Sequence, residues 1–269
     1  MQQRQIVEPY CNSAPDATRY SANAGTSDAY QQLQQHGYVI ARQLLSHEHI
    51  DALRSRLSQH LDRLAAAYLT PFERSCPQLE IGKRLNQVAK TDLGYGQSLL
   101  NALLADSHND PMFGELIETP ALRYLIDTLI PGYRIKAVTT RIRACIADYQ
   151  KFQHDWHQDL ADPHRTTGDC HQLRLTCWVP LDDVDCDTGA LAAVPGQYSD
   201  SIMKRQQDGR YRVTDASALD AHRQVLACRK GDVVLMDRFL PHKTLPIEPG
   251  VTRWAVASWI KAETIRNED

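Results

Sequence analysis

Three side chains that are far apart in the sequence have the types that bind a divalent metal. His157 and Asp159 are separated by one residue, so on an extended segment both side chains point to the same side. His242 follows the apolar run that ends at Met236 and offers a third ligand. We therefore expect His157, Asp159 and His242 to bind a divalent first-row metal ion and to form the catalytic centre.

This ligand set leaves further coordination positions open, which is the arrangement of non-haem Fe(II) oxygenases. Arg253 lies on one strand face with Ala255 and Ala257 if residues 252–260 are extended. A buried guanidinium beside two small side chains fits a carboxylate. We therefore expect a dicarboxylate to chelate the metal at one end and to pair with Arg253 at the other. Thr244, two residues after His242, is expected to add a hydroxyl contact.

The elements that must position these residues change in character along the chain. A helical pattern begins near Asp28, and a second helix opens at Ser46, the expected N-cap, with one apolar stripe through residue 64. Residues 68–96 read as irregular, and residues 97–130 read as helical in pieces that break near Pro111 and Pro120. After residue 132 the period becomes two. Strands are expected at 134–146, 172–179, 190–194, 224–228, 232–236 and 252–260.

Helices followed by many short strands indicate an α+β fold. We expect a jelly-roll (double-stranded β-helix, cupin-like) core with the N-terminal helices packed on one sheet. Residues 1–28 are polar and aperiodic and read as a flexible N-terminal arm, which leaves residues 29–269 as a single domain.

Several segments together resemble the phytanoyl-CoA dioxygenase-like family of Fe(II)/2-oxoglutarate-dependent oxygenases. They are His-Gln-Asp at 157–159, Cys-Trp-Val-Pro-Leu-Asp-Asp at 177–183, Thr-Gly-Ala-Leu-Ala-Ala-Val-Pro-Gly at 188–196, Gly-Asp-Val-Val-Leu-Met at 231–236, His242 and Arg253. The resemblance covers roughly residues 29–260. One departure is Pro-Gly-Gln-Tyr at 195–198, where the family usually has Pro-Gly-Ser-His.

The resemblance implies a dioxygenase that oxidises a small molecule. His157, Asp159 and His242 would hold Fe(II), and Arg253 would hold the far carboxylate of 2-oxoglutarate. The cosubstrates 2-oxoglutarate and O2 would be converted to succinate and CO2. Because Asp159 is present, hydroxylation or a related oxidation of a C–H bond is favoured over halogenation. The sequence does not specify the substrate, and a free metabolite of natural-product (secondary) or amino-acid-like metabolism is expected.

Other polar side chains are expected near the site. Thr139, Arg141 and Arg143 alternate on one face of the strand before the metal motif. We expect Thr139 and Arg141 to bind the cosubstrate and Arg143 to bind the substrate. Candidate substrate contacts also come from Trp178 on the next strand. Arg84 and Gln87, in the expected irregular segment, are assigned a place over the mouth of the site.

Composition narrows the class of protein. The chain has 269 residues with 30 basic and 33 acidic side chains, so no basic excess indicates nucleic acid as a partner. No apolar run is long enough to cross a membrane, and the start of the chain does not read as a signal peptide. Seven cysteines without a Cys-x-x-Cys pair favour a reducing compartment, and a cytoplasmic protein is expected.

Two other functions use the same residues. A zinc-dependent hydrolase would use the His/Asp/His set to activate water, but it leaves Arg253 without a role. A jelly-roll binding module would keep the fold and lack catalysis. Oxygen-independent product formation favours the hydrolase, and the absence of any substrate-stimulated succinate release favours the binding module.

Overall fold

Helices occupy the N-terminal half of the described chain, and strands dominate the C-terminal half. The computed structural model describes residues 19–21, 26–67, 72–147, 153–159, 172–196, 203–205, 211–213 and 215–265. The helices are α1 (Thr26–His36), α2 (His47–Ala67), α3 (Ile81–Thr91), α4 (Leu93–Asp106), α5 (Pro111–Gly114), α6 (Pro120–Leu129) and α7 (Ala216–Ala221), with 3-10 turns η2 (Phe72–Ser75), η3 (Ser107–Asn109) and η4 (Glu115–Glu118). The strands are β1 (Arg19–Ser21), β2 (Tyr38–Arg42), β3 (Tyr133–Ile146), β4 (Leu173–Pro180), β5 (Leu191–Ala193), β6 (Met203–Arg205), β7 (Tyr211–Val213), β8 (Gln224–Leu226), β9 (Val233–Asp237), β10 (His242–Thr244) and β11 (Thr252–Thr264).

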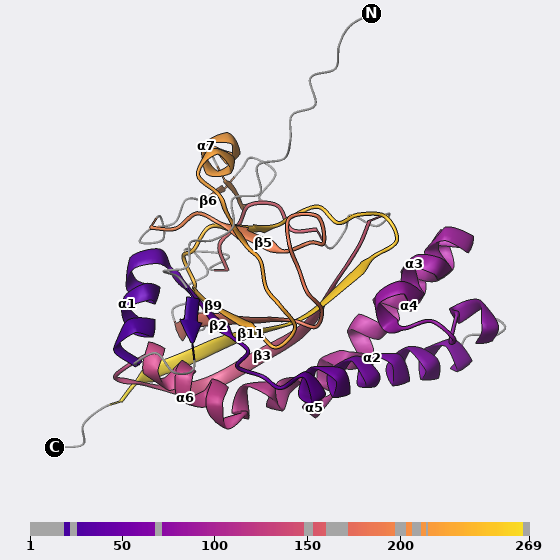
Figure 1. Ribbon diagram of the computed structural model, residues 1–269, viewed down its shortest axis with the longest axis horizontal. Coiled ribbons are helices and arrows are strands. Elements are labelled where there is room, and N and C mark those ends of the chain that lie inside the picture. The colour runs from indigo at the N-terminus through magenta and orange to yellow at the C-terminus, as the bar shows by residue number, and fades with distance from the viewer. Residues whose placement is uncertain are drawn as a thin grey trace, which may run out of the picture.

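The described strands form a large sheet, a small sheet and a separate hairpin. The large sheet has six strands in the order β1-β2-β9-β4-β11-β3, and its only parallel pair is β1 with β2. The small sheet is antiparallel, in the order β10-β5-β8, and β6 pairs with β7. Figure 1 shows α2, α5 and α6 along one face of the large sheet and β5 on the opposite side. The expected α+β class is confirmed, with antiparallel pairing throughout the small sheet.

The period-two pattern divides the apolar side chains of the large sheet between two cores. On β9, Val233 and Leu235 pack with the helices, whereas Val234 and Met236 face the small sheet. Strand β11 divides in the same way, with Trp254 in the helical core. Because both faces of these strands are buried, their sequence is almost continuously apolar. The large sheet therefore has a helix-covered face and a second face that is free to line a cavity with the small sheet.

The α2 helix shows why its sequence gives this structure. Ser46 Oγ accepts a hydrogen bond of 3.2 Å from the backbone N–H of His49, which confirms the expected N-cap. Ile50, Leu53 and Leu57 are fully buried, as is Leu61 one turn later. Spacings of three and four place them on one helix face, and burying each apolar side chain stabilises the fold by roughly 1.5–3 kcal/mol.

The expectation of irregular structure at 68–96 is wrong for most of that segment, because α3 and the start of α4 lie within it. One glycine that suggested a break, Gly96, serves packing instead. A Cβ built on Gly96 would lie 3.0 Å from Ala89 Cα, so the two helices approach closely only because residue 96 has no side chain. Trp254 Nε1 donates a hydrogen bond of 3.1 Å to the Ile81 carbonyl and ties α3 to β11.

Two parts of the expected arm, residues 1–28, are regular structure. Residues Arg19–Ser21 form β1 beside β2, and α1 begins at Thr26. The rest of the expected arm, residues 1–18 and 22–25, lies outside the described residues. The short strands β1, β6, β7 and β10 were not expected from the sequence.

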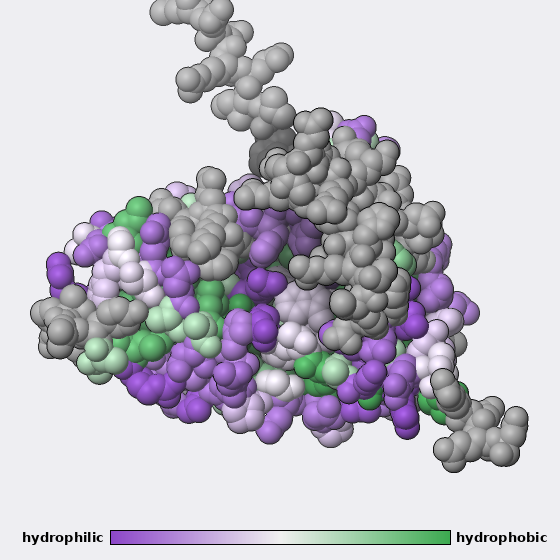
Figure 2. Space-filling view, turned by 180° about the vertical axis from the view of Figure 1, so that it is seen from behind, coloured by the Kyte–Doolittle hydropathy of each residue, from purple (hydrophilic) through white to green (hydrophobic). Residues whose placement is uncertain are grey.

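The surface is mainly hydrophilic. Figure 2 shows polar side chains over most of one face, with hydrophobic side chains in small separate groups. The exposed large hydrophobic side chains among the described residues are Tyr30, Leu93, Tyr124 and Ile265. Within the described ranges, none of the helices combines the length and the apolar character that crossing a bilayer requires.

Candidate active site

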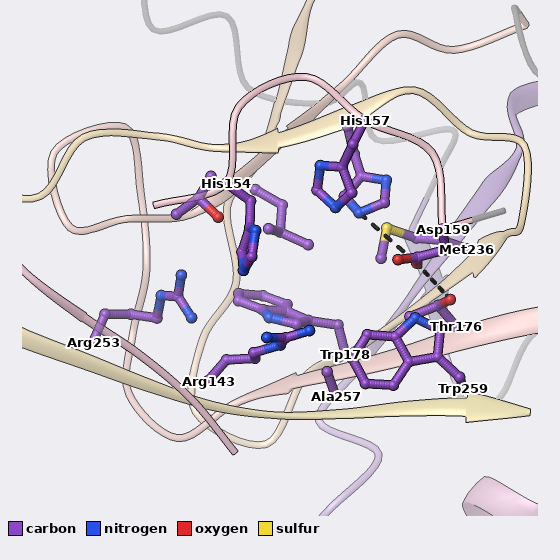
Figure 3. A pocket seen from close by; sticks show the side chains of 13 residues that line it. Arg143, His154, His157, Asp159, Thr176, Trp178, Met236, Arg253, Ala257 and Trp259 are labelled. Atoms are coloured by element: carbon purple, nitrogen blue, oxygen red, sulfur yellow. Dashed lines mark hydrogen bonds and ion pairs between the residues drawn. The ribbon is translucent and has the colours of Figure 1, made fainter. Parts of the chain in front are cut away.

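A cavity lies between the large and small sheets. Figure 3 shows that most of its polar side chains point inward from β3, β4, β11 and the segment before β4. The lining residues are Arg143, His154, His157, Asp159, Thr176, Trp178, Leu191, Met236, His242, Thr244, Arg253, Ala257 and Trp259. The cavity therefore contains all three expected metal ligands and the expected carboxylate-binding arginine.

The backbones of His157 and His242 are paired directly. Each residue donates its N–H to the carbonyl of the other, and both N···O distances are 2.9 Å. His242 also pairs with Ala193 through β10 and β5. Side chains that face each other across an antiparallel bridge point to the same side. The two imidazole centroids consequently lie 4.2 Å apart, although the residues are distant in the sequence.

Hydrogen bonds orient both imidazoles for metal binding through Nε2. The Nδ1 atom of His157 lies 2.7 Å from the Asp155 carbonyl, and Nδ1 of His242 lies 3.0 Å from the Leu240 carbonyl. A carbonyl only accepts hydrogen bonds, so each Nδ1 carries the hydrogen and each Nε2 keeps its lone pair. His242 Nε2 lies 3.9 Å from Asp159 Oδ2. Two ligands at about 2.1 Å from one ion can be up to about 4.2 Å apart, so this pair fits a shared ion.

Asp159 is held as a carboxylate. Thr176 Oγ1 donates a hydrogen bond of 2.6 Å to Asp159 Oδ2, and the Trp259 side chain donates a second hydrogen bond. Burial alone would raise the pKa of Asp159. The nearby His242 and His157 and these hydrogen bonds outweigh burial and lower the pKa. The ligand atoms of the triad all lie within 4.8 Å of one another.

The imidazoles of His157 and His154 are kept uncharged by their surroundings. Burial is the main cause that lowers the pKa of His157 to about 3, with repulsion from His242 second. Burial also lowers the pKa of His154 to about 4, helped by the positive charges of Arg143 and Arg253. Neutral imidazole is the form that binds a metal. This cavity therefore offers neutral nitrogen donors and one ionised carboxylate.

Arg253 is buried at the end of the cavity away from Asp159, with 3% of its surface exposed. Its Nε donates to the Gly189 carbonyl at 3.0 Å, and Nη2 lies 3.0 Å from Cys145 Sγ. Its Nη1 is buried and has no hydrogen-bond partner in the part of the chain that the structure describes. Gly189 has φ of +77°, and a Cβ there would lie 3.5 Å from Arg253 Nε. An orphaned N–H donor of a buried cation is the feature expected where an anionic ligand binds.

Strand register decides which of the expected cosubstrate and substrate contacts reach the cavity. Opposite residues of β11 and β3 are Ala255 with Arg143 and Ala257 with Arg141. Arg143 lines the cavity, as do Trp178 and Thr244.

Thr139 and Arg141 share the strand face of Arg143 but are not among the lining residues. Their partners across the strand pair, Trp259 opposite Thr139 and Ala257 opposite Arg141, do line it. The expectation that Thr139 and Arg141 bind the cosubstrate therefore stays a prediction.

Arg84 and Gln87 lie on α3 in the helical layer and not over the mouth of the cavity. The Arg84 guanidinium is buried against Ser75, with Nε 2.6 Å from the Ser75 carbonyl, and pairs with Asp62 at 2.6 Å. Gln87 is exposed on the helix surface. Their expected substrate contacts are wrong, because the segment is helical and packs against the large sheet.

Several cavity residues were not assigned from the sequence. Thr176 shares a face of β4 with Trp178, and that spacing was the available signal for its position. His154 lies three residues before His157, and its ring centroid lies 5.5 Å from that of His157. Met236 is the last apolar residue of β9. The hydrogen bond from Thr176 to the Asp159 carboxylate is not encoded in local sequence, because the two residues come from different segments of the chain.

The fold and the site together define an α+β protein with a buried cavity that holds two histidines, one aspartate and an arginine with an orphaned donor. A model of the phytanoyl-CoA dioxygenase (PhyH) family matches residues 33–253. The chain belongs to this family, as the sequence resemblance predicted. A Dictyostelium discoideum protein, the phytanoyl-CoA dioxygenase domain-containing protein 1 homolog, is 26% identical over 108 residues, which is 34% of this chain and 34% of that protein. The aligned part thus spans about a third of that relative.

Solved structures share the fold at low sequence identity. The carbocyclase SnoK of nogalamycin biosynthesis has a TM-score of 0.56 at 16% identity, covering 93% of this chain and 91% of SnoK. The epimerase SnoN, solved with Fe3+, α-ketoglutarate and nogalamycin RO, has a TM-score of 0.53 at 14% identity, covering 91% and 87%. EvdO2 from Micromonospora carbonacea var. aurantiaca, solved with 2-oxoglutarate, has a TM-score of 0.53 at 17% identity, covering 90% and 93%.

Proposed function

We propose that the protein is an Fe(II)/2-oxoglutarate-dependent dioxygenase that oxidises, by hydroxylation, a C–H bond of a small-molecule metabolite. In this reaction 2-oxoglutarate and O2 are converted to succinate and CO2. One observation carries the proposal. The ligand atoms of His157, Asp159 and His242 lie within 4.8 Å of one another in the same cavity as the orphaned Nη1 of Arg253.

The donor set supports ferrous iron. Two imidazole nitrogens and one carboxylate are the ligands of non-haem Fe(II) oxygenases. When bound, the iron would supply the oxidising chemistry through its open coordination positions. The protein contributes orientation: carbonyl oxygens fix each imidazole by its Nδ1–H, and Thr176 fixes one oxygen of Asp159.

The other end of the cavity supports a dicarboxylate cosubstrate. Arg253 has its guanidinium aimed into the cavity, with Nε and Nη2 engaged and Nη1 available. Charge-assisted hydrogen bonds from Arg253 would hold the far carboxylate of 2-oxoglutarate, and Thr244 would add a hydroxyl contact. Trp178 lies beside this position, with the Arg253 guanidinium carbon 5.6 Å from its ring centroid.

The cavity supports a small substrate. Its lining combines apolar side chains, such as Trp178 and Leu191, with several convergent polar groups, which is the usual character of small-molecule sites. The fold shared with SnoN and SnoK supports a substrate from secondary metabolism. We propose that the two sheets form a double-stranded β-helix and that residues 29–269 act as one domain.

The test measures succinate from 2-oxoglutarate with Fe(II) in air, together with a mass-spectrometric screen for metabolites that gain one oxygen or lose two hydrogens. Asp159→Ala is expected to abolish succinate formation. Asp187→Asn, which changes an exposed carboxyl group, serves as the control and should keep it. A zinc-dependent product that forms without oxygen would favour the hydrolase. Failure of wild-type protein to bind a divalent metal would overturn the proposal.

A further inference from the structure

The cavity contains a second guanidinium, that of Arg143. Its Cζ lies 5.0 Å from the Trp259 ring centroid, in a cation–π contact. Within the described ranges, its side chain makes no ion pair and no hydrogen bond. Arg253, by contrast, donates to a carbonyl and to a sulfur atom. Figure 3 shows Arg143 pointing into the cavity between Arg253 and the metal-ligand cluster.

Charge in the cavity is not balanced by the proposed ligands. Arg143 and Arg253 are both cations, and Asp159 is the only carboxylate among the lining residues that the structure describes. A divalent ion and the dianion 2-oxoglutarate cancel each other. One positive charge then remains in a site where burial already disfavours the charged guanidinium and lowers the pKa of Arg143. A further anion would neutralise it.

His154 provides a second polar group that points into the same cavity. Its Nε2 is buried and has no hydrogen-bond partner among the described residues. Figure 3 shows its ring pointing into the cavity on the side of Arg143 and Trp178. A neutral imidazole can donate one hydrogen bond to an acidic group. The unsatisfied donors of Arg143 and His154 thus face one volume, beside the metal ligands.

We propose, resting on the function proposed above, that Arg143 binds an acidic group of the primary substrate and that His154 adds a hydrogen bond to it. The planar fork of a guanidinium matches a carboxylate or a phosphate. The far carboxylate of 2-oxoglutarate is assigned to Arg253 and the keto acid to the metal, so Arg143 is left for the substrate. The substrate class is therefore small organic acids or phosphate monoesters.

The test is calorimetry on full-length protein loaded with Mn(II) and 2-oxoglutarate. The anionic probes are benzoate and phenyl phosphate, and the neutral probe is benzamide. At least one anion is expected to bind wild-type protein and to bind Arg143→Gln at least tenfold more weakly. Arg143→Lys should recover part of the affinity, and His154→Phe should lose a smaller factor. The matched control is Arg134→Gln, at an exposed arginine of the same strand that does not line the cavity, which should bind like wild type.

Other outcomes overturn the inference. They are equal binding of benzamide, no binding of either anion at millimolar concentration, and an Arg143→Gln variant that loses affinity for 2-oxoglutarate alone. That last result would assign Arg143 to the cosubstrate. Mn(II) affinity and the melting temperature report whether the variants fold. If wild-type protein binds neither Mn(II) nor 2-oxoglutarate, the proposed function fails, whereas Arg143-dependent binding of benzoate to metal-free protein would still support the anion site.

Discussion

His157 and His242 are joined by two backbone hydrogen bonds of 2.9 Å, so the two imidazoles are placed by main-chain pairing. The same bridge continues into the small sheet through β10 and β5. Backbone pairing within a sheet restricts the approach of the two residues much more than side-chain contacts between loops would. The spacing of the two imidazole ligands is therefore set before any metal binds.

Removing the metal should leave this bridge intact. The amides of His157 and His242 are expected to exchange with deuterium at least about 100-fold more slowly than unprotected amides in the metal-free protein, because the bridge closes without the ion. Mn(II) should slow them further by less than tenfold. Exchange at the unprotected rate in metal-free protein would show that the ion, and not the sheet, brings the two residues together.

Thr176 is expected to tune metal affinity through Asp159. Thr176→Val keeps the shape of the side chain but removes the donor that lies 2.6 Å from Asp159 Oδ2. Loss of a hydrogen bond that orients a metal ligand typically weakens metal binding about 10–100-fold. Calorimetric titration with Mn(II) measures the change. Thr176→Ser, which retains the hydroxyl, should stay near wild type, and equal affinities for the valine and serine variants would contradict this role.

Replacing Arg253 should affect cosubstrate binding before metal binding. Arg253→Ala removes a charged donor with an estimated value of about 1.5–3 kcal/mol, so the Kd for 2-oxoglutarate should rise at least about tenfold. Mn(II) affinity should change little, because Arg253 contacts no metal ligand. Arg134→Ala, at an exposed arginine of β3, is the control. Weaker Mn(II) binding with an unchanged Kd for 2-oxoglutarate would contradict the assignment.

Asp110 should make stability sensitive to acid. Arg56 Nε and His60 Nε2 each lie 2.5 Å from Asp110 Oδ2. Burial opposes ionisation, but these hydrogen bonds outweigh it and lower the pKa of Asp110 from 3.8. A folded-state pKa below the unfolded value gives stability that is present above pH 3.8 and is lost as the pH falls through the folded pKa.

Urea unfolding of wild type and Asp110→Asn at pH 6 and pH 3 measures this effect. The variant should be less stable by about 1–3 kcal/mol at pH 6, and the difference should shrink at pH 3. A difference that is constant between the two pH values would show that the ionisation of Asp110 does not contribute.

Gly231 should tolerate no side chain. Its φ is +95°, and a Cβ would lie 2.6 Å from the Leu45 carbonyl oxygen, beside the hydrogen bond from Leu45 N–H to the Gly231 carbonyl. Gly231→Ala should lower the free energy of unfolding by at least about 2 kcal/mol. Gly250→Ala is the matched control, because Gly250 has φ of +93° with no atom near its Cβ position. Equal effects of the two substitutions in denaturant unfolding would contradict the clash.

Much of the helical layer and the large sheet followed from local patterns. The apolar stripe of α2 and the Ser46 cap depend on residues a few positions apart, and period two predicted the strands that carry Arg143 and Arg253. The irregular reading of 68–96 failed because glycine is ambiguous: Gly96 allows close packing as readily as it breaks a helix. Arg84, which was interpreted as a binding residue, is part of α3, and its side chain is buried.

The sequence by itself determined the residue types of the candidate site, since the His157 and Asp159 spacing and the face of Arg253 are properties of one extended segment each. Only the tertiary structure decided that Thr176 donates to Asp159 and that Gly189 accepts from Arg253. These contacts join strands that are distant in the sequence. Their geometry depends on sheet register and on the packing of two sheets, which no local pattern of residues encodes.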